Sequence, residues 1–274
     1  MKRLIGIVVL LGCSACAVPK TQTRTEDQEQ FAALTSVIEA QRRPKSNQAM
    51  VTVAIFGGAE LSDSKALNIA IGPFLNDELG RSIRGRTGQA RPHVVSAKAD
   101  EKLPLDMETL AQGAGDQGAH IRRASHVAFV RYAGPPLSEH KQIRTTLGAA
   151  AIIASSPNHI LIDLSTRRAM DAITFAAWVK GDSTLRDQIV PGVERTPKGV
   201  TFYTRGFTKF GLPDLEMSHV APADARARFS RFQETVSTLR NGAYVKVGDT
   251  LNGMTLMTCR RAPEAFESEC VRLP

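Results

Sequence analysis

Cysteine is the residue type whose spacing first suggests chemistry in this chain. Cys13 and Cys16 form a C-x-x-C pair within "VVLLGCSACAVPK". That spacing can hold a metal or a redox disulfide, but only where a folded frame surrounds it. Lys2 and Arg3 precede a short apolar run from residue 4 to residue 11, which has the proportions of a secretory signal peptide and is too short to span a bilayer. The sequence therefore predicts a signal peptide over residues 1–12 and no metal or redox role for this pair.

The residues around Cys13 offer another use for its thiol. Leu10-Leu11-Gly12-Cys13 resembles the lipobox of bacterial lipoproteins, in which the cysteine is lipidated and becomes the new N-terminus. Because each buried CH₂ contributes roughly 0.8 kcal/mol, two or more acyl chains make a stable membrane anchor. Lipidation at Cys13 is the prediction, with Cys16 as an alternative acceptor and a plain signal peptide cleaved near Ala15 or Ala17 as the other alternative.

Two further cysteines lie near the C-terminal end, in "CRRAPEAFESEC". In an oxidising periplasm Cys259 and Cys270 are well placed to close a short loop, and a loop of this size contributes roughly 3 kcal/mol through chain entropy. The sequence predicts that disulfide, closing a tail over residues 259–274, with two unrelated thiols as the alternative.

Other catalytic and ligand-binding patterns are missing from the sequence. None of the six histidines, which include His126 and His159, falls in a metal-ligand motif, and no G-x-S-x-G elbow is present. Ser165 lies two residues from Asp163, but the sequence indicates no histidine to complete a triad. "FGGAELSDSK" and "QGAGDQGAH" are Gly-rich without matching a phosphate-binding loop, and acids such as Glu60 read as solvated surface. We predict no metal and no cofactor, and enzymatic activity stays open, with a preference against it.

The net charge of the protein limits the class of molecule that it is expected to bind. The formal net charge is +8, and loss of Lys2 and Arg3 with the signal peptide leaves +6. The basic residues are spread along the chain, a distribution that suits anionic headgroups or acidic glycans better than a nucleic acid. Export also argues against a nucleic acid as partner, so we predict none.

The apolar periodicities predict an α+β fold in which helices cover a mostly antiparallel sheet. A polar tether with one short helix is expected over residues 13–48, and the α+β domain over residues 49–258. Strands are predicted at 50–56, 93–96, 126–132, 159–165 and 201–204, with a closing hairpin-like pair in "AYVKVGD" and "MTLMTC". Helices are predicted at 63–84, at 140–154 with Ser138 as the N-cap, at 170–179 and at 223–240, and a short helix followed by a Gly-rich connection at 103–119. The order strand–helix–strand occurs twice, which suggests two related halves.

The most distinctive segment is "YTRGFTKFGLPDLEM", residues 203–217. It resembles the T-x-G-x-x-x-F-G-x-x-[DE]-[LI]-E core of an uncharacterised bacterial domain family, and the resemblance extends weakly over residues 50–251. It implies a fold and carries no reaction. The matching residues, with Arg205 beside them, make a candidate ligand loop: Thr204, Arg205, Gly206, Phe210, Gly211, Asp214 and Glu216.

A structural interpretation of the same segment is favoured over the ligand loop. Gly206 and Gly211 would permit backbone turns with φ above zero, and the aromatic residues would be buried. In that interpretation Thr204, Asp214 and Glu216 cap the turn or pair with Arg205 and Lys209.

Two functions from different classes fit these observations. The first is a non-catalytic binding or assembly protein, held by its lipid at the outer membrane and facing the periplasm, where it binds an envelope protein or, in one version, neutralises a toxin as an immunity protein. The second is an envelope hydrolase acting on cell-wall or lipid material. A cavity that joins a histidine, an acid and a hydroxyl would favour the enzyme, whereas a groove without that cluster would favour the binding protein.

Overall fold

The computed structural model describes residues 48–79, 91–100, 103, 106–181, 185–241, 245–259 and 270–274. The predicted signal peptide, Cys13, Cys16 and the tether up to residue 47 lie outside these ranges. Within the described residues, none of the helices has the length and apolar character needed to cross a membrane.

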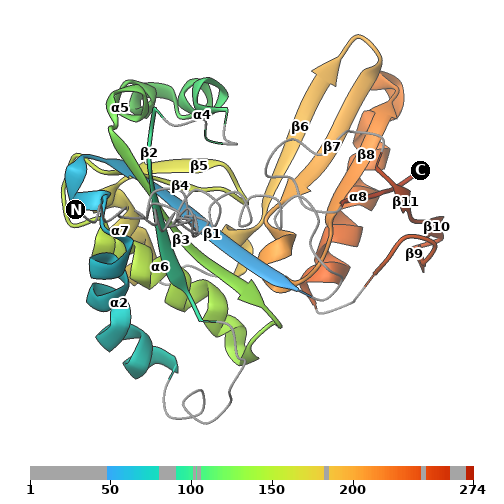
Figure 1. Ribbon diagram of the computed structural model, residues 1–274. Coiled ribbons are helices and arrows are strands. Elements are labelled where there is room, and N and C mark those ends of the chain that lie inside the picture. Colours follow the sequence, from blue (N-terminus) through green and yellow to red (C-terminus); the bar gives the residue numbers. More distant parts are fainter. Residues whose placement is uncertain are drawn as a thin grey trace, which may run out of the picture.

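The N-terminal lobe is built on a five-stranded antiparallel sheet (Figure 1). Its order is β2-β3-β1-β4-β5, and every neighbouring pair is antiparallel. The strands are β1 (Ala49–Gly57), β2 (His93–Lys98), β3 (His126–Gly134), β4 (Ile160–Asp163) and β5 (Arg168–Asp171).

The two predicted strand–helix–strand units are interleaved in this one sheet. Helix α2 (Ser64–Leu79) connects β1 to β2, and α6 (Lys141–Ile153) connects β3 to β4. Each connection crosses over one strand of the other unit, which is the split β-α-β topology of ferredoxin-like folds. The units therefore share a single sheet and do not form separate halves.

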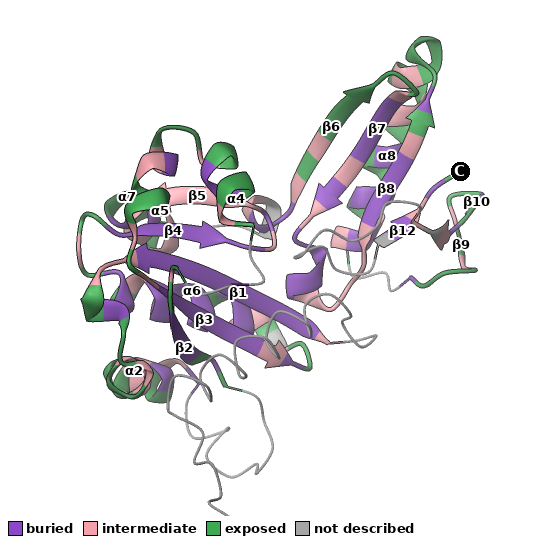
Figure 2. Ribbon diagram, turned by 45° about the horizontal axis from the view of Figure 1, so that its top comes forward, coloured by how far each residue is buried: buried purple, intermediate pink, exposed green. Residues whose placement is uncertain are grey.

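Helices cover both faces of this sheet, so its central strands are apolar on both sides (Figure 2). Val51, Val53 and Ile55 of β1 pack in one core with α2, α6 and α7 (Ala172–Lys180). Ala54 and Phe56 alternate with them and pack in a second core with α4 (Met107–Gly113) and α5 (Gly118–Arg123). The lobe thus has three layers.

Three local predictions in this lobe need correction. The Gly-rich connection after α4 folds into the 3-10 turn η2 (Gly115–Gln117) and α5. The N-cap predicted at Ser138 is His140, because Ser138–His140 form the 3-10 turn η3 with a left-handed backbone at Glu139 and His140, and the helix begins at Lys141. Met170 belongs to strand β5, since Asp171 caps α7 by accepting a hydrogen bond from the Thr174 amide at 2.8 Å.

The C-terminal lobe contains a second five-stranded sheet, with the order β11-β12-β8-β7-β6. Helix α8 (Ala225–Arg240) lies on it, and Phe232, Val236 and Leu239 enter its core. The strands are β6 (Val190–Thr196), β7 (Gly199–Arg205), β8 (Asp214–Val220), β11 (Met257–Thr258) and β12 (Cys270–Arg272). The pair β12–β8 is parallel and the other pairs are antiparallel.

Within the predicted tail, residues 270–272 form a strand of this sheet. Strand β12 lies between β11 and β8, and Val271 and Leu273 are buried in the lobe's core. The predicted closing hairpin is displaced: β9 (Thr250–Leu251) pairs with β10 (Met254–Thr255), so its turn falls between the two predicted segments.

Taken together, the sheets and helices confirm the predicted α+β class with mostly antiparallel sheets.

Candidate functional site

The candidate ligand loop is largely regular structure. Thr204 and Arg205 end strand β7, the 3-10 turn η5 (Phe207–Phe210) follows, and Asp214 and Glu216 belong to strand β8. The β8 strand was not predicted, although polar and apolar residues alternate in "DLEMS", the period of a half-buried strand. Leu215 and Met217 point into the core of the C-terminal lobe.

Asp214 organises the turn between the two strands. Its Oδ1 accepts hydrogen bonds from the Thr204 hydroxyl at 3.2 Å and from the Phe207 amide at 3.1 Å. Its Oδ2 accepts from the Gly206 amide at 3.4 Å, and the Leu215 amide donates to Thr204 Oγ1 at 2.8 Å. The spacing of threonine, glycine and aspartate in this segment therefore has a structural cause.

The two glycines of the segment adopt the conformation that the sequence predicts. Gly206 has φ of 108° and Gly211 has φ of 76°, a region that side chains disfavour. A Cβ on Gly206 would also lie 2.2 Å from the carbonyl oxygen of Gln188. Gly206 thus allows the turn to approach the chain segment that enters β6.

Arg205 and Glu216 do not reach a cavity. The Arg205 guanidinium lies 5.0 Å from the centre of the Tyr203 ring, a cation–π contact. Glu216 is buried on β8, between β12 and β7. None of the seven candidate loop residues lines either of the two cavities described below.

Lys209, at the centre of the turn, is a buried charged residue whose partner the sequence does not indicate. Its side chain is fully buried, and Nζ donates to Asp163 Oδ2 and to Gln188 Oε1, the latter at 2.9 Å. Asp163 ends strand β4 of the other lobe and is 3% exposed. The expected pairing of Lys209 with the acids of its own segment is therefore wrong, and the lysine forms a buried ion pair between the lobes.

A second contact joins the turn to the N-terminal lobe through main chain. The Lys209 carbonyl accepts a hydrogen bond at 3.0 Å from the side-chain amide of Gln142, which is fully buried on α6. Gln142 Oε1 in turn accepts from the Leu137 amide at 2.9 Å. The turn thereby holds the residues that lead into α6.

A cavity of about 510 Å³ lies against the helices that these contacts fix. We call it the α2–α6–α7 cavity. Its lining residues come from α2, from the η3–α6 segment, from the end of α7 and from η4 (Leu185–Gln188): Phe74, Glu78, Glu139, His140, Ile143, Arg144, Leu147, Gly148, Val179, Lys180, Gly181 and Gln188.

Gln188, one of the residues that line this cavity, carries a buried hydrogen-bond donor without a partner among the described residues. Gln188 is 2% exposed, its Oε1 is occupied by Lys209, and its Nε2 has no hydrogen-bond partner among the described residues. Leaving a buried donor unsatisfied costs about 1–3 kcal/mol. A bound acceptor would remove that cost.

His140 lines the same cavity in an unusual conformation. Glu139 and His140 have φ of 55° and 53°, and a left-handed backbone at bulky residues is uncommon outside functional or strained sites. The His140 ring meets Phe210 of the turn edge-on, with centroids 4.9 Å apart, and its Nδ1 is buried without a partner among the described residues. Burial lowers the pKa of His140 below its usual 6.5, which favours the neutral imidazole.

The remaining wall combines apolar and charged side chains. Phe74 lies against the α6 backbone, where a Cβ on Gly148 would come within 2.3 Å of its ring. Arg144 pairs with Glu78 at 3.2 Å on the surface, and Lys180 stands at the end of α7. The cavity is therefore amphipathic, with an aliphatic and aromatic wall and cations at its rim.

Neither Ser165 nor His159 belongs to a hydrolytic relay among the described residues. Asp163, considered as a partner for Ser165, is engaged by Lys209, and the Ser165 amide donates to its Oδ1 at 3.1 Å. A second cavity contains His159 and Glu60, but the His159 Nε2 is bonded to that acid at 2.7 Å and not to a serine. No group of three His, Cys, Asp or Glu residues suited to a metal ion occurs in the part of the chain that the structure describes.

The C-terminal cysteines lie at the start of the β11–β12 pair. Cys259 is disulfide-bonded. The β11–β12 register pairs Thr258 with Val271, and its continuation by one residue places Cys259 opposite Cys270. The side chain of Cys270 is outside the described part of the structure, so the partner stays a prediction that this register supports.

None of the protein-family models, curated proteins or solved structures compared with the chain matches it.

Proposed function

We propose that the chain is a lipid-anchored protein of the cell envelope whose folded part is a non-catalytic binding module. The lipobox-like residues before Cys13 support the anchor, with the protein held at the outer membrane and facing the periplasm. The unpartnered, buried amide of Gln188 in the α2–α6–α7 cavity is the observation that carries the binding role.

The cavity chemistry selects an amphipathic ligand. An aliphatic body suits Phe74, Leu147 and Val179, and a carboxylate or carbonyl oxygen would accept from Gln188 Nε2. Lys180 favours the carboxylate. A free carboxylic acid and an acidic, apolar chain end of a partner protein share this chemistry.

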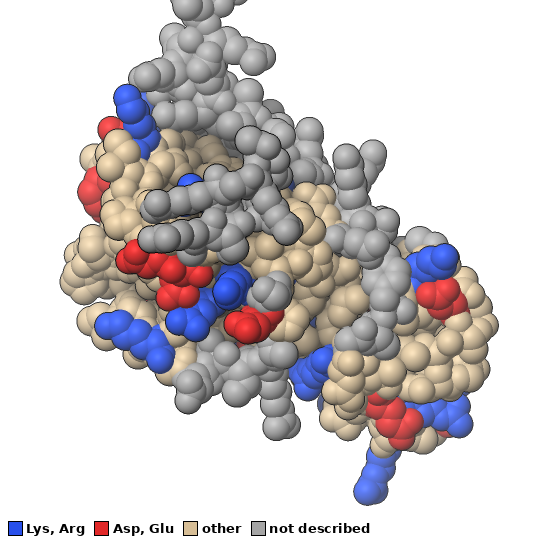
Figure 3. Space-filling model, turned by 90° about the horizontal axis from the view of Figure 1, so that it is seen from below, with Lys and Arg blue, Asp and Glu red and all other residues tan. Residues whose placement is uncertain are grey.

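Surface charge is compatible with such local recognition. On the face drawn in Figure 3, basic and acidic side chains of the described residues stand next to one another and do not form a broad field of one sign. Attraction of an anionic ligand would therefore depend on the few cations at the cavity rim.

Octanoate is a suitable probe for this proposal, with octylammonium as the charge-reversed control. Val179→Trp fills the cavity, and Ile173→Trp places the same residue on an exposed position of the same helix, where Ile173 is 69% exposed. Titration calorimetry should show saturable octanoate binding to the wild type and to Ile173→Trp, lost in Val179→Trp. Failure of the wild type to bind octanoate in preference to octylammonium would reject the proposed ligand chemistry.

The anchor and the partner class are tested separately in cells. Cross-linking followed by capture from envelopes should enrich a specific protein with the wild type and lose it with Cys13→Ala, which would be displaced from the membrane. An envelope hydrolase remains the alternative function, and it would be favoured if the purified folded protein cleaved cell-wall or lipid substrates. Capture of a toxin would indicate that the protein acts as an immunity protein.

A further inference from the structure

A second cavity, of about 690 Å³, lies at the end of the N-terminal sheet where β1 ends and β3 begins. We call it the His159 cavity. Three segments far apart in the sequence line it, from the end of β1, from α5 and its C-terminal end, and from the turn before β4: Phe56, Gly57, Gly58, Glu60, His120, Arg123, Ala124, Ser125, Ser156, Asn158 and His159. Polar side chains and glycine make up most of its lining.

The "FGGAE" segment builds one wall of this cavity. The His159 ring is 1% exposed and packs against Gly57, where a Cβ would lie 2.6 Å from the ring. Glu60 Oε1 accepts from the Gly58 amide at 2.8 Å and contacts His159 Nε2 at 2.7 Å. The hydrogen bonds from His159 and the Gly58 amide lower the pKa of Glu60 to about 2, so this carboxylate stays ionised and is directed at His159.

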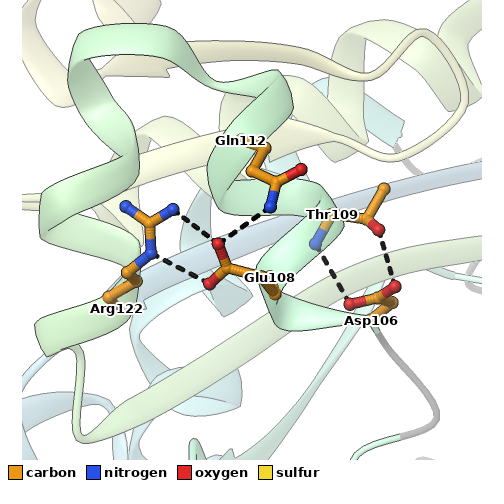
Figure 4. A network of polar contacts seen from close by, with 5 residues as sticks. All are labelled: Asp106, Glu108, Thr109, Gln112 and Arg122. Carbon is orange, nitrogen blue, oxygen red and sulfur yellow. Dashed lines mark hydrogen bonds and ion pairs between the residues drawn. The ribbon is translucent and has the colours of Figure 1, made fainter.

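Helix α5 supplies basic side chains to another wall. His120 and Arg123 are exposed residues of its last turn and line the cavity. A network on the outer surface fixes the helix (Figure 4): Arg122 donates to both carboxylate oxygens of Glu108 on α4, at 3.0 and 2.7 Å. Successive arginines thus have different roles, because Arg122 joins two helices and Arg123 faces the cavity.

We propose that the His159 cavity binds a small polyhydroxylated molecule that carries an oxyanion, as in a sugar phosphate or a uronic acid. Arg123 and His120 of α5 face the oxyanion, whereas the ionised Glu60 carboxylate is held against His159 beside the end of β1. The hydroxyls of Ser125 and Ser156 and the amide of Asn158 hydrogen-bond to the hydroxyl groups of the ligand. This site is independent of the α2–α6–α7 cavity.

Glucose 6-phosphate, glucuronate and glucose test the proposal and distinguish the two oxyanions. Titration calorimetry of the wild type should show binding of at least one anionic sugar at least tenfold tighter than that of glucose. Arg123→Gln should weaken that binding about tenfold or more, as expected for loss of a charge-assisted hydrogen bond. Arg122→Gln is the matched control on the adjacent residue and should bind as the wild type does.

The outcomes separate this site from the first. Val179→Trp should leave binding of the anionic sugar unchanged, so failure of octanoate binding would not affect this test. The proposal is overturned if neither anionic sugar binds more tightly than glucose, or if Arg122→Gln and Arg123→Gln lose affinity equally. Circular dichroism of both variants verifies that α5 remains folded.

Discussion

At the scale of single residues, the buried Lys209–Asp163 pair dominates the junction between the lobes. Lys209 is fully buried and Asp163 is 3% exposed. Gln188 accepts one further hydrogen bond from Lys209. Removal of one member of a buried ion pair leaves the other charge desolvated, whereas removal of both is often tolerated.

Lys209→Met should therefore destabilise the protein by about 3–5 kcal/mol, because Asp163 loses its partner. The double variant Asp163→Leu with Lys209→Met should recover part of that loss. Urea denaturation measures both, with Lys198→Met at an exposed position as the control. A double variant that is no more stable than Lys209→Met would contradict this account of the pair.

Glu60 makes the free energy of unfolding depend on pH in the acidic range. Its pKa is about 2 in the folded protein against an ordinary 4.5, so the folded state holds fewer protons than the unfolded state between these values. The contribution of Glu60 is present in full above about pH 4.5 and is lost as the pH falls toward 2. Thermal unfolding of the wild type and Glu60→Gln should converge over that range. A constant difference from pH 6 to pH 2 would exclude the effect.

Residue contacts of this kind were the least predictable part of the molecule. Glu60 read as solvated surface and His159 as a lone histidine because the two are 99 positions apart. Lys209 and Asp163 are separated by 46 positions, and local sequence patterns cannot predict contacts between residues so far apart in the chain. The conformations of Gly206 and Gly211 were predictable, since they depend on the residue type itself.

At the scale of elements, the turn η5 depends on the absence of a side chain at Gly206. Gly206→Ala should destabilise the protein by at least about 1–2 kcal/mol, from the positive φ alone, and the contact with the Gln188 carbonyl adds to this. Gly72→Ala, within α2, should instead stabilise by about 0.5–1 kcal/mol, because no atom lies within 4 Å of its Cβ. Equal effects in urea denaturation would refute this assignment of Gly206.

Strongly apolar elements were predicted and weakly patterned ones were not. Strands β1, β3 and β4 are buried on both faces and appear in the sequence as continuous apolar runs. Strand β6 contains Pro191 and Gly192 and is mostly exposed at the sheet edge, so it lacks any period. Its place in the sheet comes from pairing with β7, a tertiary effect.

At the scale of the whole molecule, the two lobes share an interface but have separate cores. Phe210 packs against the core of each lobe, next to the Lys209 contacts. The C-terminal lobe also needs β12, whose removal would uncover β8 and leave Val271 and Leu273 missing from the core.

Deletion of residues 270–274 should therefore unfold the C-terminal lobe while the three-layer lobe keeps its structure. Limited proteolysis should cut first within residues 190–259, and removal of Pro274 alone is the control. Proteolytic resistance of the truncated protein equal to that of the wild type would show that β12 is dispensable.

The central position of β12 also determines the order in which the two lobes can fold as the chain is synthesised. Strands β1 to β5 can pair once residue 171 is available, but β8 cannot gain its parallel neighbour until residue 272 has been translated. The N-terminal lobe can therefore fold during translation, whereas the other sheet must wait with an open edge. A ribosome that stalls within the last few codons would release a chain with one finished lobe and one that proteases can recognise as incomplete.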